Sequence, residues 1–307
     1  MVYTGQRIKA KIDYETAFKG TASSTDGEHD LPIGIGARIT NFSARNNIER
    51  AYTIGSRLSA DYLPLRFEGD ISIEMTMSEI YWFDLILHNT GNPLEIGTSI
   101  KSFKVSVQYP DNFYRLAEGV VVNRATITAR AGDPVTVRLD CIYASESKVS
   151  GSISEPSLST RPFTFAGGTV DFGGLSTTIQ NAEITINNNA ELLWALGDRA
   201  PIDAVLKQLE LEGRMSIYGD SALADVLDSF YVTNDVNTMS ITLTFIDLVG
   251  ENNGGRKVEI VLSDAVINEV PHSVVANETI VADVVFYAKN ITVTTYTHDG
   301  TSWVQDT

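Results

Sequence analysis

The sequence predicts a mainly β protein with two tandem domains of one kind, each carrying one helix. Polar and apolar residues alternate along both halves of the chain, which is typical of antiparallel strands with one packed face and one wet face. The stretch at residues 46–57 has a second copy at residues 188–199, and a period this long indicates duplicated domains rather than small stacked repeats. A chain of 307 residues is long enough for each half to bury its own core.

The repeat keeps one constant offset without a gap. Its matched residues are Asn46, Asn47, Glu49, Gly55 and Arg57 in the first copy and Asn188, Asn189, Glu191, Gly197 and Arg199 in the second. Strand alternation is lost across both copies, so we expect long loops at residues 46–64 and 188–204, each joining the two strands of a hairpin. Loops of this length in a compact domain usually have a function.

Composition excludes several classes of protein. The formal net charge of −16 argues against a surface that binds nucleic acid through clustered Lys and Arg, and it also suits a high-salt host. The single cysteine, Cys141, excludes an intramolecular disulfide and is expected to be a buried thiol. The sequence begins without an apolar signal region and has no run near the ~18 apolar residues of a membrane helix, so we expect neither secretion by the common route nor membrane binding.

The first half of the chain is predicted to run as strand, long loop, strand, helix and further strands. Residues 1–30 are polar and rich in turn residues, and we expect an N-terminal arm there. A first domain at residues 31–144 follows, with a helix that begins at Ser78 as its N-cap. The expected strands lie at residues 38–45, 65–75, 103–107, 120–129 and 135–144.

The second half repeats this order. Residues 145–162 are rich in serine and are expected to form a linker, followed by a second domain at residues 163–289 and a C-terminal tail at residues 290–307. The expected strands lie at residues 182–187, 209–217, 240–245, 257–267 and 279–288, with a helix after Ser221. If amphipathic hairpins of this kind from several subunits pair side by side, they close a barrel and remove their exposed edges.

No grouping of residues in the sequence indicates catalysis, a cofactor or a metal. The four histidines, His29, His88, His272 and His298, are scattered. Asp84 and His88 lie four residues apart on the expected helix and could give two metal ligands, but a solvated pair at a helix end is the favoured interpretation because no third ligand accompanies them. We therefore predict that the chain is not an enzyme, binds no cofactor and holds no metal.

Three features recur in the same order in both halves. They are the NN…G.R stretches, the strands LRFEGDISI at residues 65–73 and LELEGRMSI at residues 209–217 with a helix after each, and the endings IYA at residues 142–144 and FYA at residues 286–288. This order, across residues 36–144 and 176–288, resembles the tail tube proteins of long-tailed bacterial and archaeal viruses. The resemblance implies two tandem β-sandwich or half-barrel domains of the tube type, which oligomerise into a closed β-barrel ring.

The same resemblance implies a function and partners. The chain would be a structural virion protein that forms trimeric, pseudo-hexameric rings, stacked as the channel through which viral DNA passes during ejection. Its partners would be further copies of itself, the tape measure protein, the tail terminator and tail-tip proteins, with viral DNA only in transit. It would reside in the virion tail after assembly in the host cytoplasm.

The resemblance also assigns roles to particular residues. The polar strand faces would line the lumen, through Asn41, Ser43, Glu68, Asp70, Ser72 and Glu74 in the first domain and Glu183, Thr185, Asn187, Glu210, Glu212 and Ser216 in the second. Like charge would keep DNA phosphates from adhering, although Arg45, Arg66 and Arg214 depart from a purely acidic lining. The loops would meet adjacent subunits or the next ring, through Asn46, Asn47, Glu49 and Arg57 and through Asn188, Asn189, Glu191 and Arg199, with solvated loop charges as the alternative.

Other functions remain open from the sequence alone. A tail-tip hub or a distal tail protein can use the same domains but forms one ring rather than a stack. From a different class, a carbohydrate-binding β module would use Trp194, Tyr218 or Trp303 as sugar platforms. An enzyme is the last alternative, and it would require a pocket that gathers His88 or His272 with carboxylates.

Overall fold

The computed structural model of the chain is mainly β, as predicted, with one short helix in its described part. It describes residues 9–306 except 26–27, 53, 55–58, 110–111, 155, 157, 159, 173–174, 177–178, 219–237, 248–253 and 274–280. The helix expected after Ser221 lies outside the described residues. Within the described part, no helix is long and apolar enough to cross a membrane.

The strands and the helix fall into two series along the chain. The first series is β1 (Lys9–Tyr14), β2 (Leu31–Pro32), β3 (Ile35–Tyr52), β4 (Ser59–Thr76), α1 (Trp82–Ile86), β5 (Phe103–Tyr109), β6 (Phe113–Arg130), β7 (Thr136–Tyr143) and β8 (Ser145–Ser150). The second is β9 (Phe163–Phe172), β10 (Leu175–Ser176), β11 (Ile179–Asn187), β12 (Glu191–Leu193), β13 (Asp203–Val205), β14 (Glu210–Tyr218), β15 (Met239–Asp247), β16 (Arg256–Glu269), β17 (His272–Ser273), β18 (Val281–Ala288), β19 (Asn290–His298) and β20 (Trp303–Gln305).

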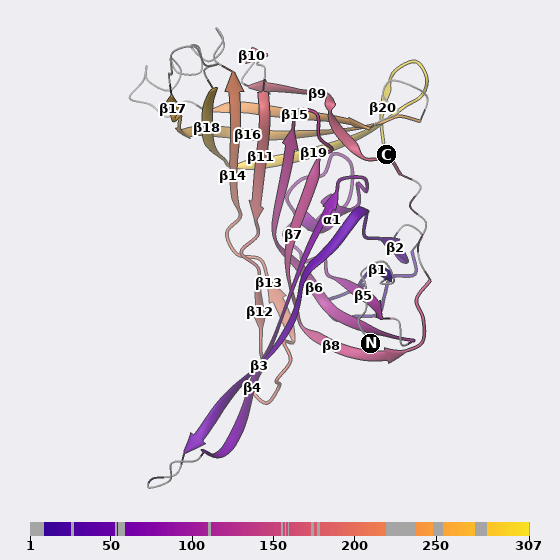
Figure 1. Cartoon of the computed structure of the whole chain (residues 1–307), viewed down its shortest axis with the longest axis vertical. Helices are drawn as coiled ribbons and strands as arrows, with labels where there is room; N and C mark the ends of the chain where they lie inside the picture. Colours follow the sequence, from indigo (N-terminus) through magenta and orange to yellow (C-terminus); the bar gives the residue numbers. More distant parts are fainter. Residues whose placement is uncertain are drawn as a thin grey trace.

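One antiparallel sheet, here called the wall, runs through both halves of the chain. Its strand order is β3-β4-β7-β6-β11-β14-β18, and the last four residues of β16 extend it beyond β18. Figure 1 shows the wall upright, with the β3–β4 hairpin projecting beyond the body. The neighbouring strands β6 and β11 therefore join the two halves through main-chain pairing.

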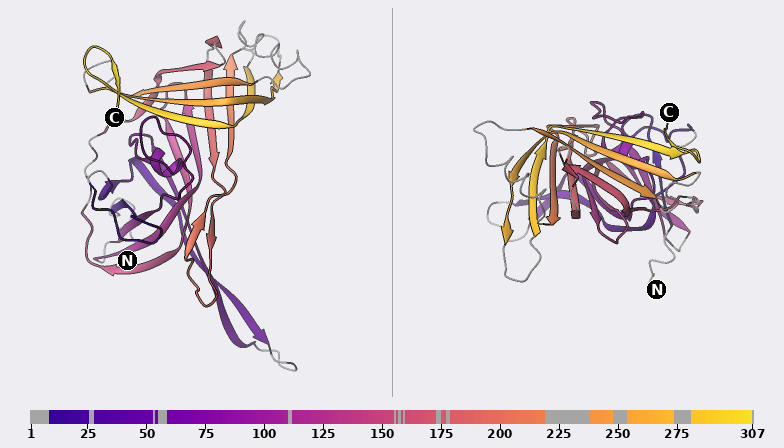
Figure 2. Two further views of the ribbon diagram at one scale, coloured as in Figure 1. Left: turned by 180° about the vertical axis from the view of Figure 1, so that it is seen from behind. Right: turned by 90° about the horizontal axis from the view of Figure 1, so that it is seen from above.

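An outer sheet covers the wall in each half. In the first half β2, β1, β5, the start of β6 and β8 pair in that order, and in the second half β10, β9, β15, the start of β16, β19 and β20 do so. The long strands β6 and β16 each belong to both an outer sheet and the wall. Figure 2 shows the outer strands of the second half crossing above the wall strands.

The same pairings occur in both halves. The pairs β1–β5, β3–β4, β4–β7, β5–β6, β6–β7 and β6–β8 correspond to β9–β15, β11–β14, β14–β18, β15–β16, β16–β18 and β16–β19. Each half thus contributes four strands to the wall in one order: β3-β4-β7-β6 in the first and β11-β14-β18-β16 in the second. This order fixes which strand lies at each edge of the wall.

The core lies between the wall and the outer sheets and follows the predicted alternation. Ile71, Ile73 and Met75 of β4 are buried, and Trp82 and Phe83 of α1 pack in the same cluster. Burial of these side chains removes apolar surface from water and provides most of the driving force for folding. The thiol of Cys141 is buried as expected, and burial raises its pKa.

Helix α1 is shorter than predicted, and Ser78 is not its N-cap. The helix begins at Trp82 after Tyr81, without a side-chain cap. The Ser78 hydroxyl accepts a hydrogen bond from the main-chain N–H of Ile35 over 3.4 Å and lies 3.3 Å from Glu79, so it is engaged elsewhere.

A glycine in the middle of a wall strand faces an aromatic ring in both halves. Gly69 lies opposite Tyr143 and Gly213 lies opposite Phe286, and in each case a Cβ atom would overlap the ring. Phe286 therefore takes the place of Tyr143, whereas alignment of the endings IYA and FYA would have placed Tyr287 there. Tyr287 points to the opposite face and is exposed.

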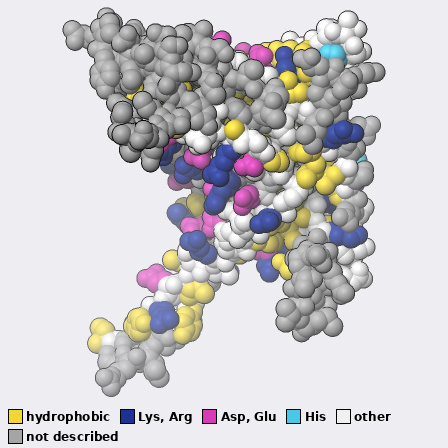
Figure 3. All heavy atoms as spheres, turned by 45° about the horizontal axis from the view of Figure 1, so that its top comes forward, with side chains coloured by type: hydrophobic (Ala, Val, Ile, Leu, Met, Phe, Trp, Pro, Cys, Tyr) yellow, Lys and Arg dark blue, Asp and Glu magenta, His cyan; other side chains and the backbone are white. Residues whose placement is uncertain are grey.

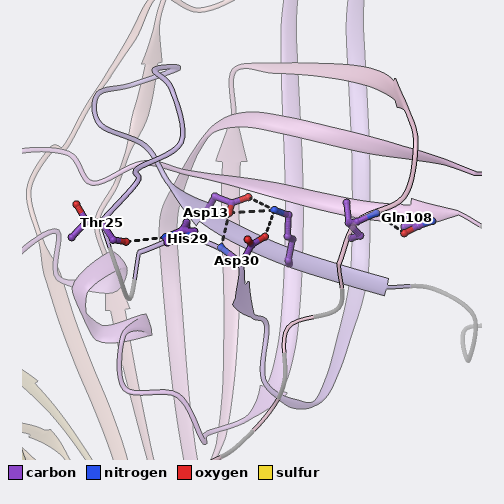
Figure 4. Close-up of polar contacts among 7 residues, drawn as sticks. Asp13, Thr25, His29, Asp30 and Gln108 are labelled. Carbon is purple, nitrogen blue, oxygen red and sulfur yellow. Dashed lines mark hydrogen bonds and ion pairs between the residues drawn. The ribbon is translucent and has the colours of Figure 1, made fainter.

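The N-terminal segment and the serine-rich segment contain strands. Within the expected N-terminal arm, residues 9–14 form β1, and Lys11 bonds to Asp30 over 2.5 Å and to Asp13 over 3.2 Å (Figure 4). Burial acts to lower the pKa of Lys11, but these two carboxylates outweigh it and hold it above its ordinary value. Within the expected linker, residues 145–150 form β8 against β6, because a free strand edge is available there.

Candidate assembly surfaces

The wall has one packed face and one polar face, and the predicted lumen residues share the polar face. Residues that lie opposite each other on neighbouring strands point to the same side of the sheet, and the strand registers place the predicted lumen residues opposite one another or opposite other polar residues. The pairs are Asn41 with Ser72, Ser43 with Asp70, Arg38 with Glu74, Arg45 with Glu68, Glu183 with Arg214, Thr185 with Glu212, Asn187 with Glu210 and Asn181 with Ser216. The polar face is therefore continuous across both halves.

Sequence reasoning missed the contribution of β6 and β7 to this face. Arg124, Thr126, Arg138 and Asp140 project from these two strands between the two sets of predicted residues. The alternation in β6 and β7 was visible in the sequence, but it could not show that these strands stand in the middle of the wall.

The polar face carries acidic and basic side chains in alternation rather than a uniform negative charge. Arg45 pairs with Asp70 at 3.3 Å, Arg138 pairs with Asp140 at 3.2 Å, and Arg214 pairs with Asp283 at 2.5 Å. Figure 3 shows acidic and basic side chains intermixed above the projecting hairpin. The acidic lining suggested from the sequence is thus modified by arginines that pair with its carboxylates.

The ion pair between Arg214 and Asp283 is joined by a hydrogen bond from Ser216. Asp283 accepts hydrogen bonds from Arg214 and from the Ser216 hydroxyl, both over 2.5 Å. Burial acts to raise the pKa of Asp283, but the bonds from Ser216 and Arg214 outweigh it and hold that pKa below its usual range. The same hydrogen bond raises the pKa of Arg214. Both groups are therefore charged at neutral pH.

The polar face is hollowed beside these pairs. A hollow of about 510 Å³ is lined by the polar side chains of the wall, among them Glu74, Thr126, Thr128, Arg138 and Glu183. Its lining of hydroxyls and charged side chains suits water and counterions better than an apolar ligand.

The region expected to be a loop at residues 46–64 is a projecting hairpin instead. Residues 46–52 continue β3 and residues 59–64 belong to β4, and the two strands pair with each other up to Tyr52 and Ser59. The sequence lost its alternation there because the hairpin has no packed face, so burial did not impose a period of two. We call residues 46–52 and 59–65 the hairpin arm.

The hairpin arm exposes large apolar side chains. Ile48 is 57% exposed, and Tyr52, Tyr62, Leu63 and Leu65 are also exposed. Figure 3 shows hydrophobic side chains along the projecting hairpin. A two-stranded ribbon is marginally stable alone in water, and clustered apolar groups on it indicate an interaction surface.

The second expected loop, at residues 188–204, contains a smaller hairpin of β12 and β13 that braces the arm. Arg199 donates a hydrogen bond to Asn46 Oδ1 over 3.0 Å and another to the main-chain oxygen of Leu65 over 3.3 Å. Arg66 lies over the ring of Trp194, 4.8 Å from its centroid. Two residues predicted to contact other subunits, Asn46 and Arg199, thus bond to each other within the chain.

The other predicted contact residues occupy varied positions. Glu191 forms an ion pair with Lys207, and Asn189 donates to the main-chain oxygen of Gln208 over 2.8 Å. Asn47 and Glu49 lie on the hairpin arm, and Arg57 lies outside the described residues.

Asn188 is buried, with 5% of its surface exposed, and joins the two halves. Its side-chain nitrogen donates to the main-chain oxygens of Ile86 over 2.9 Å and Val122 over 3.0 Å, and lies 3.2 Å from His88 Nε2. Its contacts are therefore within the chain.

The side chain of His272 lies outside the described residues, and Asp84 and His88 do not form the solvated pair that the sequence suggested. His88 is 2% exposed, so the expected solvated pair is wrong, and burial lowers the pKa of His88 to about 4. Asp84 instead accepts from the Tyr14 hydroxyl over 3.4 Å, and burial raises its pKa to about 6. Among the described residues, no group of three or more His, Cys, Asp or Glu side chains could hold a metal ion.

Two of the three aromatic residues considered as sugar platforms are engaged within the chain. The ring of Trp194 is covered by Arg66, and Trp303 packs edge-on against His298 with ring centroids 5.0 Å apart. The side chain of Tyr218 lies outside the description. The prominent features of the described molecule are the polar face, the wall edges and the hairpin arm. Open strand edges and exposed apolar side chains are typical of structural proteins that assemble.

Comparison with known proteins agrees with this class. The sequence profile of the phage tail tube protein family matches residues 5–297. The chain therefore belongs to the phage tail tube protein family, whose members are structural components that assemble into the tube of a viral tail. No curated protein matches the chain in a sequence search.

Proposed function

We propose that this chain is the tail tube subunit of a long-tailed virus and that its wall joins the walls of other copies into a closed β-barrel ring. The β6–β11 pairing supports this proposal, because it is a junction between two sets of four wall strands. In it, the last strand of one set pairs with the first strand of the next. The same junction between chains would pair the end of β16 with β3 of a neighbour.

The edges needed for this junction are free in the described part of the chain. There β3 pairs with β4 only, and the last four residues of β16 pair with β18 only. Open strand edges favour pairing with another chain, and closure into a barrel removes them.

The proposal includes a tandem duplication and a ring of three chains. The recurrence of the strand pairings in both halves supports the duplication, with domains at residues 31–144 and 163–289, between an N-terminal arm at 1–30, a linker at 145–162 and a tail at 290–307. Three chains of two sets each would give a ring with pseudo-sixfold symmetry. Electron microscopy of the assembled particle would measure the ring symmetry and the tube length.

In this ring the polar face of the wall would line the channel for viral DNA. Paired Arg and carboxylate side chains would present little net charge to the phosphates, so the channel would neither bind the DNA tightly nor repel it strongly along its length. The twelve predicted lumen residues keep this role as part of the proposal, joined by Arg124, Arg138 and Asp140.

The hairpin arm would contact the adjacent subunit or the next ring. Its exposed apolar side chains support this role, because docking would remove them from water. Asn47, Glu49 and Arg57 remain candidate contact residues on or near the arm. The ends of the tube would meet the tape measure protein, the tail terminator and the tail-tip proteins, in virions assembled in the host cytoplasm.

The test is assembly of the purified chain, followed by sedimentation and negative-stain electron microscopy over a range of protein and salt concentrations. We expect stacked rings that form tubes. Protein that stays monomeric under all conditions would overturn the proposal, and single rings that never stack would favour a tail-tip hub or distal tail protein.

A further inference from the structure

The β6–β11 junction is fixed by an asparagine at a bulge of β6. The register of β6 against β7 shifts between Val122 and Arg124, which leaves Asn123 as the extra residue. Its main-chain oxygen accepts from the N–H of Asn188 and its Oδ1 accepts from the N–H of Ala190, both over 2.8 Å. Asn123 therefore holds the chain where it leaves β11 and sets the register of the two strands.

Strand β16 has a bulge of the same kind near the corresponding place. It lies opposite Phe286 and Val285, whereas the β6 bulge lies opposite Cys141 and Asp140, two residues before Tyr143, the counterpart of Phe286. Its register against β18 shifts between Ile267 and Glu269, so Asn268 is the extra residue. The sequences around the two bulges are VVNR at residues 121–124 and VINE at residues 266–269. The side chain of Asn268 is exposed and makes no hydrogen bond with the part of the chain that the structure describes.

We propose that Asn268 receives a segment of β3 within residues 46–50 of a second copy of this chain, as Asn123 receives residues 188–190 within the chain. This inference rests on the ring closure proposed above and names the side chain that fixes its register. The main-chain N–H groups of the neighbour's β3 would donate to the oxygen atoms of Asn268.

Two alignments place the counterpart of residues 188–190 in β3, two residues apart. The repeat in the sequence matches Asn46 with Asn188. The strand registers place Ala44 opposite Gly69 and Ile184 opposite Gly213, and this match puts Ile48 in the place of Asn188. For residues 188–190 the repeat therefore gives residues 46–48 and the registers give residues 48–50, and the two alignments together cover residues 46–50.

The strand edge beyond Asn268 is compatible with a neighbour despite Pro271. Asp283 donates its main-chain N–H to the oxygen of Pro271 over 3.1 Å. The N and O atoms of one strand residue point to the same side, so the missing N–H of Pro271 is on the β18 side. The outer edge of this segment does not lose a donor at Pro271.

The test applies one substitution at two corresponding positions. Asn268→Leu and Asn123→Leu remove the amide at similar volume, and Asn268→Asp keeps an oxygen acceptor. We expect N123L to lower the unfolding temperature of the monomer and N268L to leave it unchanged. We expect N268L to raise the critical concentration for ring assembly about tenfold, the usual scale for a lost hydrogen bond with an unsatisfied partner. In N268D the critical concentration should return most of the way to the wild-type value.

The possible outcomes separate this inference from the proposed function. If the wild-type chain forms rings and N268L forms them at the same concentration, the role of Asn268 is overturned and ring formation stands. If N268L lowers the unfolding temperature as much as N123L, Asn268 acts within its own chain and the inference also fails. If the wild-type chain forms no rings, both proposals fail, because Asn268 then has no neighbour.

Discussion

Arg199 donates a hydrogen bond from Nη2 to Oδ1 of Asn46 over 3.0 Å, and the two residues stand 153 positions apart. They belong to the two copies of the repeat, so the second copy supports the first. The main-chain oxygen of Arg199 also accepts from the N–H of Phe67 over 2.9 Å. These bonds hold the base of the hairpin arm against the β12–β13 hairpin and set the direction in which the arm projects.

Loss of the Arg199 side chain should loosen the base of the arm. We expect Arg199→Ala to speed amide hydrogen exchange at Leu65 and Phe67 while lowering global stability by about 1 kcal/mol or less, since the pair is exposed. Arg199→Lys is the matched control and should loosen the arm nearly as much, because lysine lacks the fork that reaches two oxygens. Unchanged exchange at both amides in R199A would show that the arm does not depend on this brace.

The contact between Gly213 and Phe286 should show strong coupling in a double-mutant cycle. Gly213→Ala places a Cβ in the volume of the ring and should destabilise the monomer by about 1–3 kcal/mol, the range for overpacking. Phe286→Leu should restore part of that loss in the double variant, because the smaller side chain makes room. Chemical denaturation of the four proteins measures the coupling, and strictly additive effects would contradict the proposed overlap.

His88 should make the chain less stable in mild acid. The pKa of His88 is lowered from 6.5 to about 4, because burial disfavours the charged imidazolium. The unfolded chain therefore binds a proton at this residue between pH 4 and 6.5 that the folded chain does not bind. Its contribution to stability, up to about 3 kcal/mol, is complete above pH 6.5 and is lost as the pH falls toward 4. Urea denaturation at several pH values in this range should show that the free energy of unfolding falls less steeply with decreasing pH in His88→Gln than in the wild type.

Asp84 provides a control of opposite sign for this pH dependence. Burial raises the pKa of Asp84 from 3.8 to about 6, so the folded chain binds a proton that the unfolded chain has released. The contribution of the protonated carboxyl is therefore greatest at low pH and is lost as the pH rises from about 4 to 6. Asp84→Asn should steepen the rise in stability between pH 4 and 6, and a shallower rise would contradict this assignment.

The exposed side chains of the hairpin arm should matter for assembly and not for folding. We expect the double substitution Ile48→Ser and Tyr62→Ser to leave the unfolding temperature of the monomer within a few degrees of the wild type, while few or no tubes form. Tyr287→Ser is the matched control, because Tyr287 is an exposed aromatic residue on the polar face. If electron microscopy shows tubes of normal length in the arm variant, the hairpin arm is not an assembly contact.

Charge reversal on the polar face should slow DNA release without blocking assembly. Glu74→Lys with Glu212→Lys adds positive charge beside Arg138 and Arg214, where phosphates would then adhere. Glu95→Lys, outside the wall, is the control with the same kind of charge change. Particles carrying the polar-face variant should release DNA more slowly in a dye-accessibility assay, and more so at low salt. Equal rates in all three particles would place the polar face away from the DNA.

Local pattern was enough to predict which residues of a strand are buried. The alternation around Ile71 and Ile73 assigned the packed face and the polar face correctly, and all twelve predicted lumen residues share one face of the wall. The pattern failed at residues 46–52, which form a strand with no buried face. A period of two arises only where one face is removed from water, so a fully exposed strand leaves no such signal.

The sequence by itself determined the β class, the strand faces, the buried Cys141 and the recurrence of its elements, because each depends on a local pattern of apolar residues. Only the tertiary structure decided that Asn46 is exposed at the base of an arm while Asn188 is buried between the halves, although both begin the same repeat. It also decided that β6 and β11 are neighbours and that Phe286 rather than Tyr287 covers Gly213. These outcomes depend on which distant strand lies alongside, and strand neighbours are chosen by packing over the whole chain rather than by the residues next to them in sequence.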